Sequence, residues 1–326
     1  MTKTLIQELK ARCLNGPGLD QTEIVTLLNL DPASDDCREI RRVAHEAAKE
    51  ITGGRAYLWG AVGVDFAPCA MNCDFCSFGA NWRLVKKPYV LSEVEIMAHV
   101  RYFTNNGVRY IVLRTTEFFS IEILEKLARK IKSEIPGAYE LILNIGDFDA
   151  ATAQRLYAAG VDGVYHALRL REGTHTRFNP LKRLETLNAV NKSPLKLIHL
   201  VEPIGPEHAE SELADIFLNA LDYNVAVGGA MARVPVKGTP LGNTPIVDNE
   251  RLAQIIAVLR LAGGYQVPDI CVHPASDAAV GSGANVVVVE TGAIPRDRYF
   301  SSREWQRFDV DAAKAMLQKA GYVITG

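Results

Sequence analysis

Short apolar runs alternate with amphipathic segments along most of the chain, and this alternation predicts strands separated by helices. Runs rich in Val, Ile and Leu that lack a polar face are typical of parallel strands covered by helices. We expect eight such strands, at residues 55–64, 110–113, 141–143, 163–165, 195–201, 226–231, 270–272 and 286–289.

The segments between the strands carry helix signals. Ser92, followed three residues later by Glu95, forms a capping box that begins one helix, and Pro136 ends another. The expected helices lie at residues 92–107, 121–135, 150–159, 181–190, 207–221, 251–262, 275–280 and 310–320. Each strand–helix unit spans roughly 30 residues, the spacing of a (β/α)8 TIM-type barrel. The alternative is an open doubly wound sheet, but no G-x-G-x-x-G follows the first strand.

The first 55 residues predict a separate helical segment. Leu5, Leu9 and Cys13 recur at helical spacing. The candidate N-caps of two further helices are Asp20, and Asp35 or Asp36. We therefore expect two parts: an N-terminal helical cap on the bottom of the barrel, residues 1–55, and the barrel with its C-terminal helix, residues 56–326.

Composition excludes several classes of protein. The chain has 326 residues, 48% hydrophobic and 23% charged, which is ordinary for a globular protein. Its net charge of −2 gives no electrostatic footprint for nucleic acid or an anionic membrane. No apolar run is long enough to span a bilayer, and the N-terminus does not resemble a signal peptide. Six cysteines, three of them clustered, fit a reducing cytoplasm better than a disulfide framework.

The clustered cysteines stand in the loop after the first strand and carry the strongest chemical signal. Their spacing is C-x3-C-x2-C, from Cys69 through Cys73 to Cys76. A closed structural zinc site needs four nitrogen or sulfur ligands, and the next His downstream is only His99. Three thiolates on one loop instead fit a [4Fe-4S] cluster with one iron left open. A zinc knuckle, or free thiols in a turn, is the alternative.

With Phe75 just before the last cysteine, the motif resembles the signature of the radical S-adenosylmethionine (SAM) enzymes. Within them, the chain is similar to the group of the hydrogenase-maturation protein HydE, methylornithine synthase PylB and biotin synthase. Shared stretches include Gly238-Thr239-Pro240-Leu241 and the C-terminal segment from Asp309 to Tyr322. The resemblance implies a [4Fe-4S] cluster, SAM, a small-molecule substrate and an external electron donor of flavodoxin or ferredoxin type.

The resemblance also implies residues that bind SAM, at the carboxyl ends of the strands where such barrels carry their sites. After the second strand the family usually has Gly-Gly-Glu, whose acid holds the SAM amino group. This chain reads Thr115-Thr116-Glu117, so only Glu117 matches. A carboxylate is a suitable acceptor for a cationic amine. Phe75 joins this cofactor-binding set.

Two further SAM contacts follow the fourth strand. By the same resemblance, Glu172 touches the SAM ribose or amine, and Arg183 in the next helix binds its carboxylate. A guanidinium suits that role because its planar fork meets a carboxylate bidentately. Arg169 and Arg171 compete with Arg183 for the same role.

Cys271 and His273 end the seventh strand and share one of its faces. If that face is the inward one, a thiol and an imidazole project towards the substrate cavity. His273 would then hydrogen-bond the substrate or move a proton, and Cys271 would pack against it. The alternative is a small core residue and a solvated histidine.

The resemblance implies that the reduced cluster cleaves SAM to methionine and a 5′-deoxyadenosyl radical, which acts on a small substrate in the barrel. Rearrangement of a carbon skeleton, or assembly of a metallocofactor fragment, are the two expected outcomes. Biotin synthase has further barrel cysteines for a second, sulfur-donating cluster. Only Cys13, Cys37 and Cys271 remain here, so sulfur insertion is not expected. One alternative is a non-catalytic iron–sulfur or zinc-binding barrel. Another is a metal hydrolase, but the His and Asp residues at the strand ends are too scattered in this sequence to support it.

Overall fold

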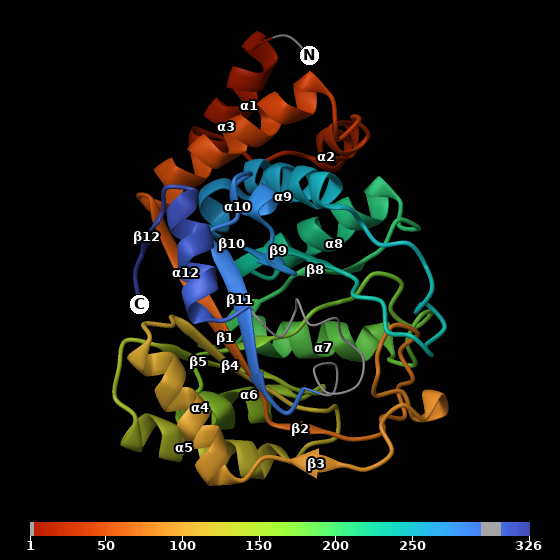
Figure 1. Cartoon of the computed structure of the whole chain (residues 1–326), viewed down its shortest axis with the longest axis vertical. Coiled ribbons are helices and arrows are strands. Elements are labelled where there is room, and N and C mark those ends of the chain that lie inside the picture. Colours follow the sequence, from red (N-terminus) through yellow and green to blue (C-terminus); the bar gives the residue numbers. More distant parts are fainter. Residues whose placement is uncertain (1–2, 295–307) are drawn as a thin grey trace.

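The computed structural model describes residues 3–294 and 308–326 and shows a closed barrel of parallel strands surrounded by helices (Figure 1). The barrel strands are β1 (Arg55–Gly63), β4 (Tyr110–Arg114), β5 (Glu140–Asn144), β6 (Gly163–Tyr165), β7 (Lys196–Ile198), β9 (Val225–Ala232), β10 (Asp269–His273) and β11 (Val286–Gly292). Because β10 pairs with β9 and β11, and β11 pairs with β1, the sheet closes on itself. The predicted (β/α)8 fold and all eight predicted strands are confirmed.

Shorter strands extend the barrel at its ends. The predicted strand 195–201 is divided into β7 and β8 (Val201–Ile204), because the pairing with β9 shifts register. β2 (Asp65–Phe66) and β3 (Tyr89–Val90) form a two-stranded antiparallel ribbon, and β12 (Val323–Ile324) pairs with the start of β1.

The helices cover the outside of the barrel. They are α4 (Glu93–Asn105), α5 (Ile121–Glu134), α6 (Ala150–Ala158), α7 (Pro180–Asn191), α8 (Glu210–Asp222), α9 (Asn249–Gly263), α10 (Asp277–Val280) and α12 (Val310–Lys319), with short 3-10 turns η1 (Ala80–Trp82) and η2 (Gly264–Gln266). The capping box of Ser92 and Glu95 is confirmed at the start of α4. Among the described residues, no helix is both long and apolar enough to cross a membrane.

Alternation along the strands creates two hydrophobic cores. On β1, Trp59 and Ala61 point into the barrel, whereas Leu58 and Val62 face the surrounding helices. The inner core also contains Tyr110, Val112, Ile142, Ile198, Leu200, Val227, Cys271, Val286 and Val288. The barrel interior is therefore packed, and space for ligands is left only towards the carboxyl ends of its strands.

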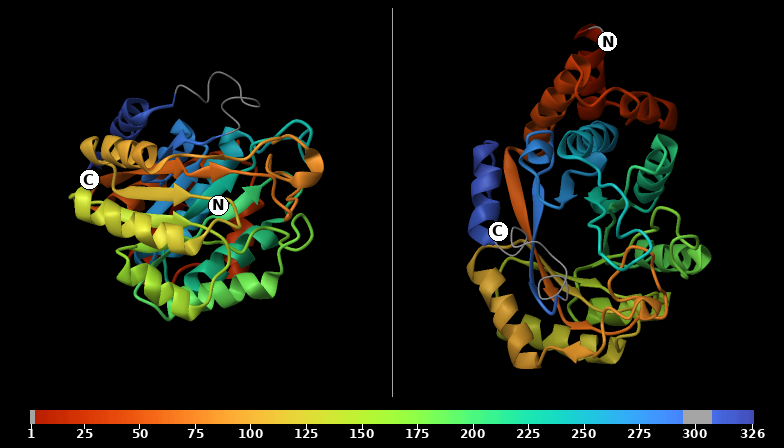
Figure 2. Two further views of the ribbon diagram at one scale, coloured as in Figure 1. Left: turned by 90° about the horizontal axis from the view of Figure 1, so that it is seen from below. Right: turned by 45° about the vertical axis from the view of Figure 1, so that its right-hand side comes forward.

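Three helices precede the barrel: α1 (Lys3–Asn15), α2 (Gln21–Leu28) and α3 (Asp35–Thr52). They gather at one end of the molecule (Figure 2) and pack mainly on α8 and α9. Asp20 caps α2 as predicted. The prediction for α3 was wrong: Ser34 is its N-cap, with Oγ accepting from the Cys37 N–H (3.2 Å). Asp35 and Asp36 occupy the first turn, where their charge favours the helix dipole.

Arg260 on α9 is fully buried and links α9 to the segments that precede β10 and β11. Its Nε donates to the Gly283 carbonyl (2.9 Å), and its Nη1 donates to the Pro268 carbonyl (2.8 Å). Its Nη2 donates to Asn285 Oδ1 (2.8 Å). Gly283 and Asn285 precede β11, and Pro268 precedes β10, so one guanidinium fixes the entry of two adjacent strands.

We predict that Arg260→Leu destabilises the protein, because the buried oxygens that it bonds lose their donor. The expected loss is about 3 kcal/mol, or a fall in Tm of about 5–10 °C, followed by circular dichroism. Arg129→Leu is the matched control, since exposed Arg129 makes one hydrogen bond within the described part of the chain, to the Ala158 carbonyl. Equal Tm values for the two variants would contradict this account.

Candidate active site

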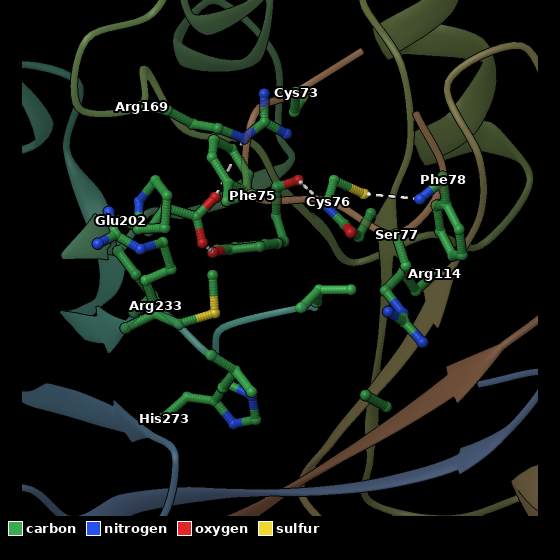
Figure 3. A pocket seen from close by; sticks show the side chains of 18 of the residues that line it. Cys73, Phe75, Cys76, Ser77, Phe78, Arg114, Arg169, Glu202, Arg233 and His273 are labelled. Carbon is green, nitrogen blue, oxygen red and sulfur yellow. Dashed lines mark hydrogen bonds and ion pairs between the residues drawn. The ribbon is translucent and has the colours of Figure 1, made fainter. Parts of the chain in front are cut away.

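The cysteine loop, residues 69–76, is shaped by its own backbone. The Cys69 N–H donates to the Phe78 carbonyl (2.6 Å), and the Cys76 N–H donates to the Cys73 carbonyl (2.9 Å). Asn72 has a φ of 42°, in the left-handed region that Asn tolerates, and so turns the chain between the first two cysteines. All three cysteines line a single cavity of about 290 Å³ at the carboxyl ends of the strands (Figure 3).

Two other loops hold the cysteine loop in place. In the β6–α7 loop, His175 Nδ1 lies 3.0 Å from Asp74 Oδ2, and the Arg177 N–H donates to the Met71 carbonyl (3.0 Å). In the β9–α9 loop, the Leu241 N–H donates to the Asp74 carbonyl (2.9 Å). The Gly-Thr-Pro-Leu stretch noted in the sequence therefore supports the cysteine loop.

The donors of the cysteine loop fit an iron–sulfur cluster. Burial raises the pKa of the Cys69 and Cys73 thiols, and coordination to a metal is what removes such protons. Within residues 3–294 and 308–326, no three His, Cys, Asp or Glu side chains lie close enough together to hold one metal ion. In a [4Fe-4S] cluster each thiolate ligates a different iron. The loop thus offers three donors and leaves the fourth iron to another ligand.

Glu117 follows β4, and its side chain lines the same cavity as the thiols. Its Oε1 accepts from the Asp147 N–H (3.2 Å), just beyond β5. Burial raises the pKa of Glu117, and the Arg183 guanidinium opposes that rise. Thr116, which stands where the family usually has glycine, bonds Asp65 of β2 through its N–H (2.7 Å) and its hydroxyl. Thr116 therefore fastens the end of β4 to the strand that leads into the cysteine loop.

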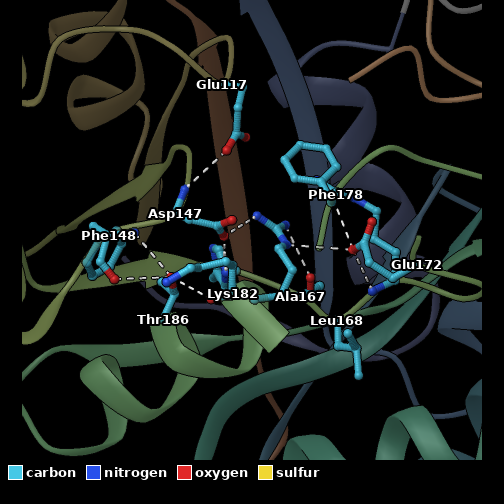
Figure 4. A network of polar contacts seen from close by, with 12 residues as sticks. Glu117, Asp147, Phe148, Ala167, Leu168, Glu172, Phe178, Lys182 and Thr186 are labelled. Atoms are coloured by element: carbon cyan, nitrogen blue, oxygen red, sulfur yellow. Dashed lines mark hydrogen bonds and ion pairs between the residues drawn. The ribbon is translucent and has the colours of Figure 1, made fainter. Parts of the chain in front are cut away.

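Arg183 on α7 is buried and does not line the cavity. Figure 4 shows Asp147 and Glu172 within one network of polar contacts. The Nη1 of Arg183 pairs with Asp147 Oδ1 (3.0 Å), and its Nε lies 3.6 Å from Glu172 Oε2. Its Nη2 donates to the Ala167 carbonyl (3.2 Å), and its guanidinium lies 4.9 Å from the centre of the Phe178 ring. The positive charge of Arg183 is thus already paired with two carboxylates of the protein.

Arg169, in the loop after β6, does line the cavity. Its guanidinium lies between Glu172 (Nη1–Oε2 3.4 Å) and Glu202 (Nε–Oε1 3.5 Å). The Glu172 side chain is only 1% exposed and stands behind Arg169, outside the lining. Arg171 lies away from the cavity, because its guanidinium pairs with Glu212 on α8 (2.9 Å).

The floor of the cavity is formed by inward-facing residues of the barrel. His273 lines it at the end of β10, whereas Cys271, deeper on the same strand face, is fully buried in the inner core. Burial raises the pKa of the Cys271 thiol. The Tyr165 hydroxyl donates to the Glu202 carboxylate, and burial raises the pKa of both groups. Trp59 also lines the floor, and its Nε1 has no hydrogen-bond partner among the described residues.

The structure brings together part of the set predicted from the sequence. The predicted residues that line the cavity are Cys69, Cys73, Cys76, Phe75, Glu117 and His273; those outside its lining are Glu172, Arg183, Arg171 and Cys271. Their chemical roles stay predictions. The sequence reasoning missed Trp59, Arg114, Tyr165, Glu202 and Glu290, which also line the cavity. The available signal was their position, because each lies within a predicted strand or just beyond its end.

Comparisons with known proteins agree with this site. Residues 66–215 match the model of the Radical SAM superfamily. A biotin synthase of Sulfurihydrogenibium sp. is 22% identical, over 79% of this chain and 78% of that protein. Biotin synthase 1 of Corynebacterium diphtheriae is 24% identical, over 78% of this chain and 76% of that protein.

Two solved structures share the fold. Methylornithine synthase PylB superposes with a TM-score of 0.79 and 18% identity, over 98% of this chain and 97% of that one. HydG, a maturase of the [FeFe]-hydrogenase, gives a TM-score of 0.81 and 15% identity, over 99% and 76%.

The barrel, the cysteine loop and the matched domain define an enzyme of the radical SAM class, whose cofactors are a [4Fe-4S] cluster and SAM. Within that class the chain is similar in sequence to biotin synthases and in fold to PylB and HydG. The alternative of a non-catalytic iron–sulfur or zinc-binding barrel is thereby set aside.

We predict about four irons per chain after anaerobic reconstitution, because the three loop thiols hold one cluster. Replacing Cys69, Cys73 or Cys76 by Ala should abolish iron binding, measured by iron and sulfide assay. Cys271→Ala is the matched control and should retain the iron, since its thiol is buried outside the cavity. Full activity with zinc, or an iron count near eight, would reject the single-cluster site.

Proposed function

We propose that this enzyme holds SAM beside its cluster in the cavity and acts on a small substrate against the barrel floor. The main support is that the three loop thiols, the Glu117 carboxylate and the Arg169 guanidinium line one cavity. The same cavity is also lined by polar residues of the inner barrel wall. When bound and reduced by an external donor of flavodoxin or ferredoxin type, the cluster supplies the reductive cleavage of SAM to methionine and a 5′-deoxyadenosyl radical.

The charged ends of SAM call for charged partners that face the cavity. Glu117 and Arg169 both line the cavity, and we assign Glu117 to the amino group of SAM and Arg169 to its carboxylate. We prefer Arg169 to Arg183 because Arg169 lines the cavity, whereas Arg183 is buried outside its lining. Arg183 and Glu172 then act as positioning residues that fix Arg169 and the loop beyond β5. Phe75 supplies an apolar wall between the second and third cysteines (Figure 3).

The substrate would bind against the floor of the cavity. His273 and Glu202 offer a polar contact from the inner wall, and Trp59 presents an indole N–H. Arg114 and Glu290 form a loose ion pair (Nη2–Oε1 3.9 Å) that also lines the cavity. Groups of both charges, with N–H donors between them, suit a small polar substrate better than an apolar one. His273 is the residue that we propose to contact it and to hold or move a proton.

The relatives named biotin synthase raise sulfur insertion as an alternative outcome. The chain has six cysteines, and the three outside the loop are Cys13, Cys37 and Cys271. All three are buried and none lines the cavity, so a second, sulfur-donating cluster would find no thiol ligand there. We therefore favour a single-cluster enzyme that rearranges a carbon skeleton or makes a metallocofactor fragment.

We predict that Arg169→Lys weakens SAM binding about tenfold or more, because an ammonium cannot meet a carboxylate with two parallel hydrogen bonds. Glu117→Gln should weaken it similarly by removing the negative charge opposite the SAM amine. Isothermal titration calorimetry of the cluster-loaded protein measures both effects.

Arg171→Lys is the matched control for Arg169→Lys. Arg171 lies in the same loop but pairs with Glu212 away from the cavity, so SAM affinity should be unchanged. Unchanged affinity in both Glu117→Gln and Arg169→Lys would reject the assignment. A loss confined to Arg183→Lys, with the fold intact, would return the carboxylate contact to Arg183.

A further inference from the structure

Five exposed cations stand in loops that contact the cysteine loop or lie next to such contacts. We call them the cationic rim: Arg83, Lys86, Lys87, Arg177 and Lys237. All five side chains belong to exposed residues, and none makes an ion pair or a side-chain hydrogen bond within residues 3–294 and 308–326. Some exposed arginines elsewhere are paired, for example Arg42 with Glu39 and Glu46 on α3.

Contacts of the backbone place the rim next to the cysteine loop. Arg177 donates its own N–H to the Met71 carbonyl inside that loop (3.0 Å). The segment of Arg83, Lys86 and Lys87 directly follows η1, whose Ala80 N–H donates to the Cys69 carbonyl (2.9 Å).

Lys237 belongs to the loop that holds the cysteine loop from the other side. Its neighbour Gly238 lies against Leu84, since a β-carbon built on Gly238 would be 3.0 Å from Leu84 Cδ2. In both Figure 1 and Figure 2 the chain around η1 and the loop before α9 run close together at one side of the molecule. The rim cations therefore come from three loops that meet around the cluster ligands.

The segments that carry the rim contain no acidic residue of their own. The chain as a whole is slightly acidic, with a net charge of −2. Yet no Asp or Glu occurs in the three segments that carry the rim, which are residues 80–88, 173–180 and 234–245. The cysteine loop itself has one acid, Asp74, and that carboxylate contacts His175. An unpaired cluster of one sign projects a field that attracts an opposite surface.

We propose that the cationic rim is the docking surface for a small acidic one-electron carrier protein, an inference that rests on the proposed function. One electron leaves the carrier's cofactor and enters the cluster, and no atom or proton has to be transferred. Complementary charge accelerates such an encounter and orients the partner over the cysteine loop. Redox encounters bury little surface, so a few charges spread over three loops suffice.

The test measures association of the cluster-loaded enzyme with a bacterial flavodoxin that carries FMN, by stopped flow at low and high salt. Lys86→Glu/Lys87→Glu should lower the association rate constant at low salt about tenfold or more and flatten its dependence on salt. Lys126→Glu/Lys192→Glu is the matched control. It changes the net charge equally at exposed positions on α5 and after α7, and should keep the rate within about twofold.

Equal rates for the rim and control variants would overturn the proposal. So would a rim variant that loses affinity for an RNA oligonucleotide while flavodoxin association is unchanged, since the rim would then be a nucleic-acid surface. Iron content, SAM affinity and reduction by dithionite should be the same in both variants. Failure of the dithionite-reduced wild type to cleave SAM would refute the proposed function instead. The association rates would still decide whether the rim binds the carrier.

Discussion

Charged groups buried behind the cavity wall constrain the rest of this site. Arg183 lies between Asp147 and Glu172, and Glu172 in turn supports Arg169. An isolated charge in such a place would be strongly unfavourable, so each member requires its neighbours. The loops after β5 and β6 are thereby tied to α7, and Arg169, one of the arginines that line the cavity, is held by Glu172 behind it. Glu117 joins the same arrangement through the Asp147 N–H.

The fold could be predicted almost completely from the sequence. Apolar runs without a polar face predicted all eight strands, because a closed parallel barrel covered by helices leaves its strands no solvent face. The differences are local. The N-cap of α3 is Ser34 and not Asp35 or Asp36. The helix expected at residues 207–221 begins only at Glu210. Glu207, three residues earlier, pairs with Arg233 and belongs to the loop.

The site was predicted less completely, for a physical reason. The cysteines could be recognised because their ligand spacing lies within one loop. Arg169 and Arg171 could not be told apart, since alternation applies only inside a strand, and both lie beyond β6. Arg171 adopts a φ of 54°, which turns the chain and directs its guanidinium to Glu212. Glu202 went unnoticed because its role depends on Tyr165 from another strand.

The proposed function requires that one cavity hold both the open iron of the cluster and SAM. Electron paramagnetic resonance of the dithionite-reduced protein tests it most directly, with and without SAM labelled with ¹⁷O in its carboxylate. The account predicts that SAM changes the cluster signal and that the label shows hyperfine coupling to the cluster. An unchanged signal at a SAM concentration that saturates binding would contradict it.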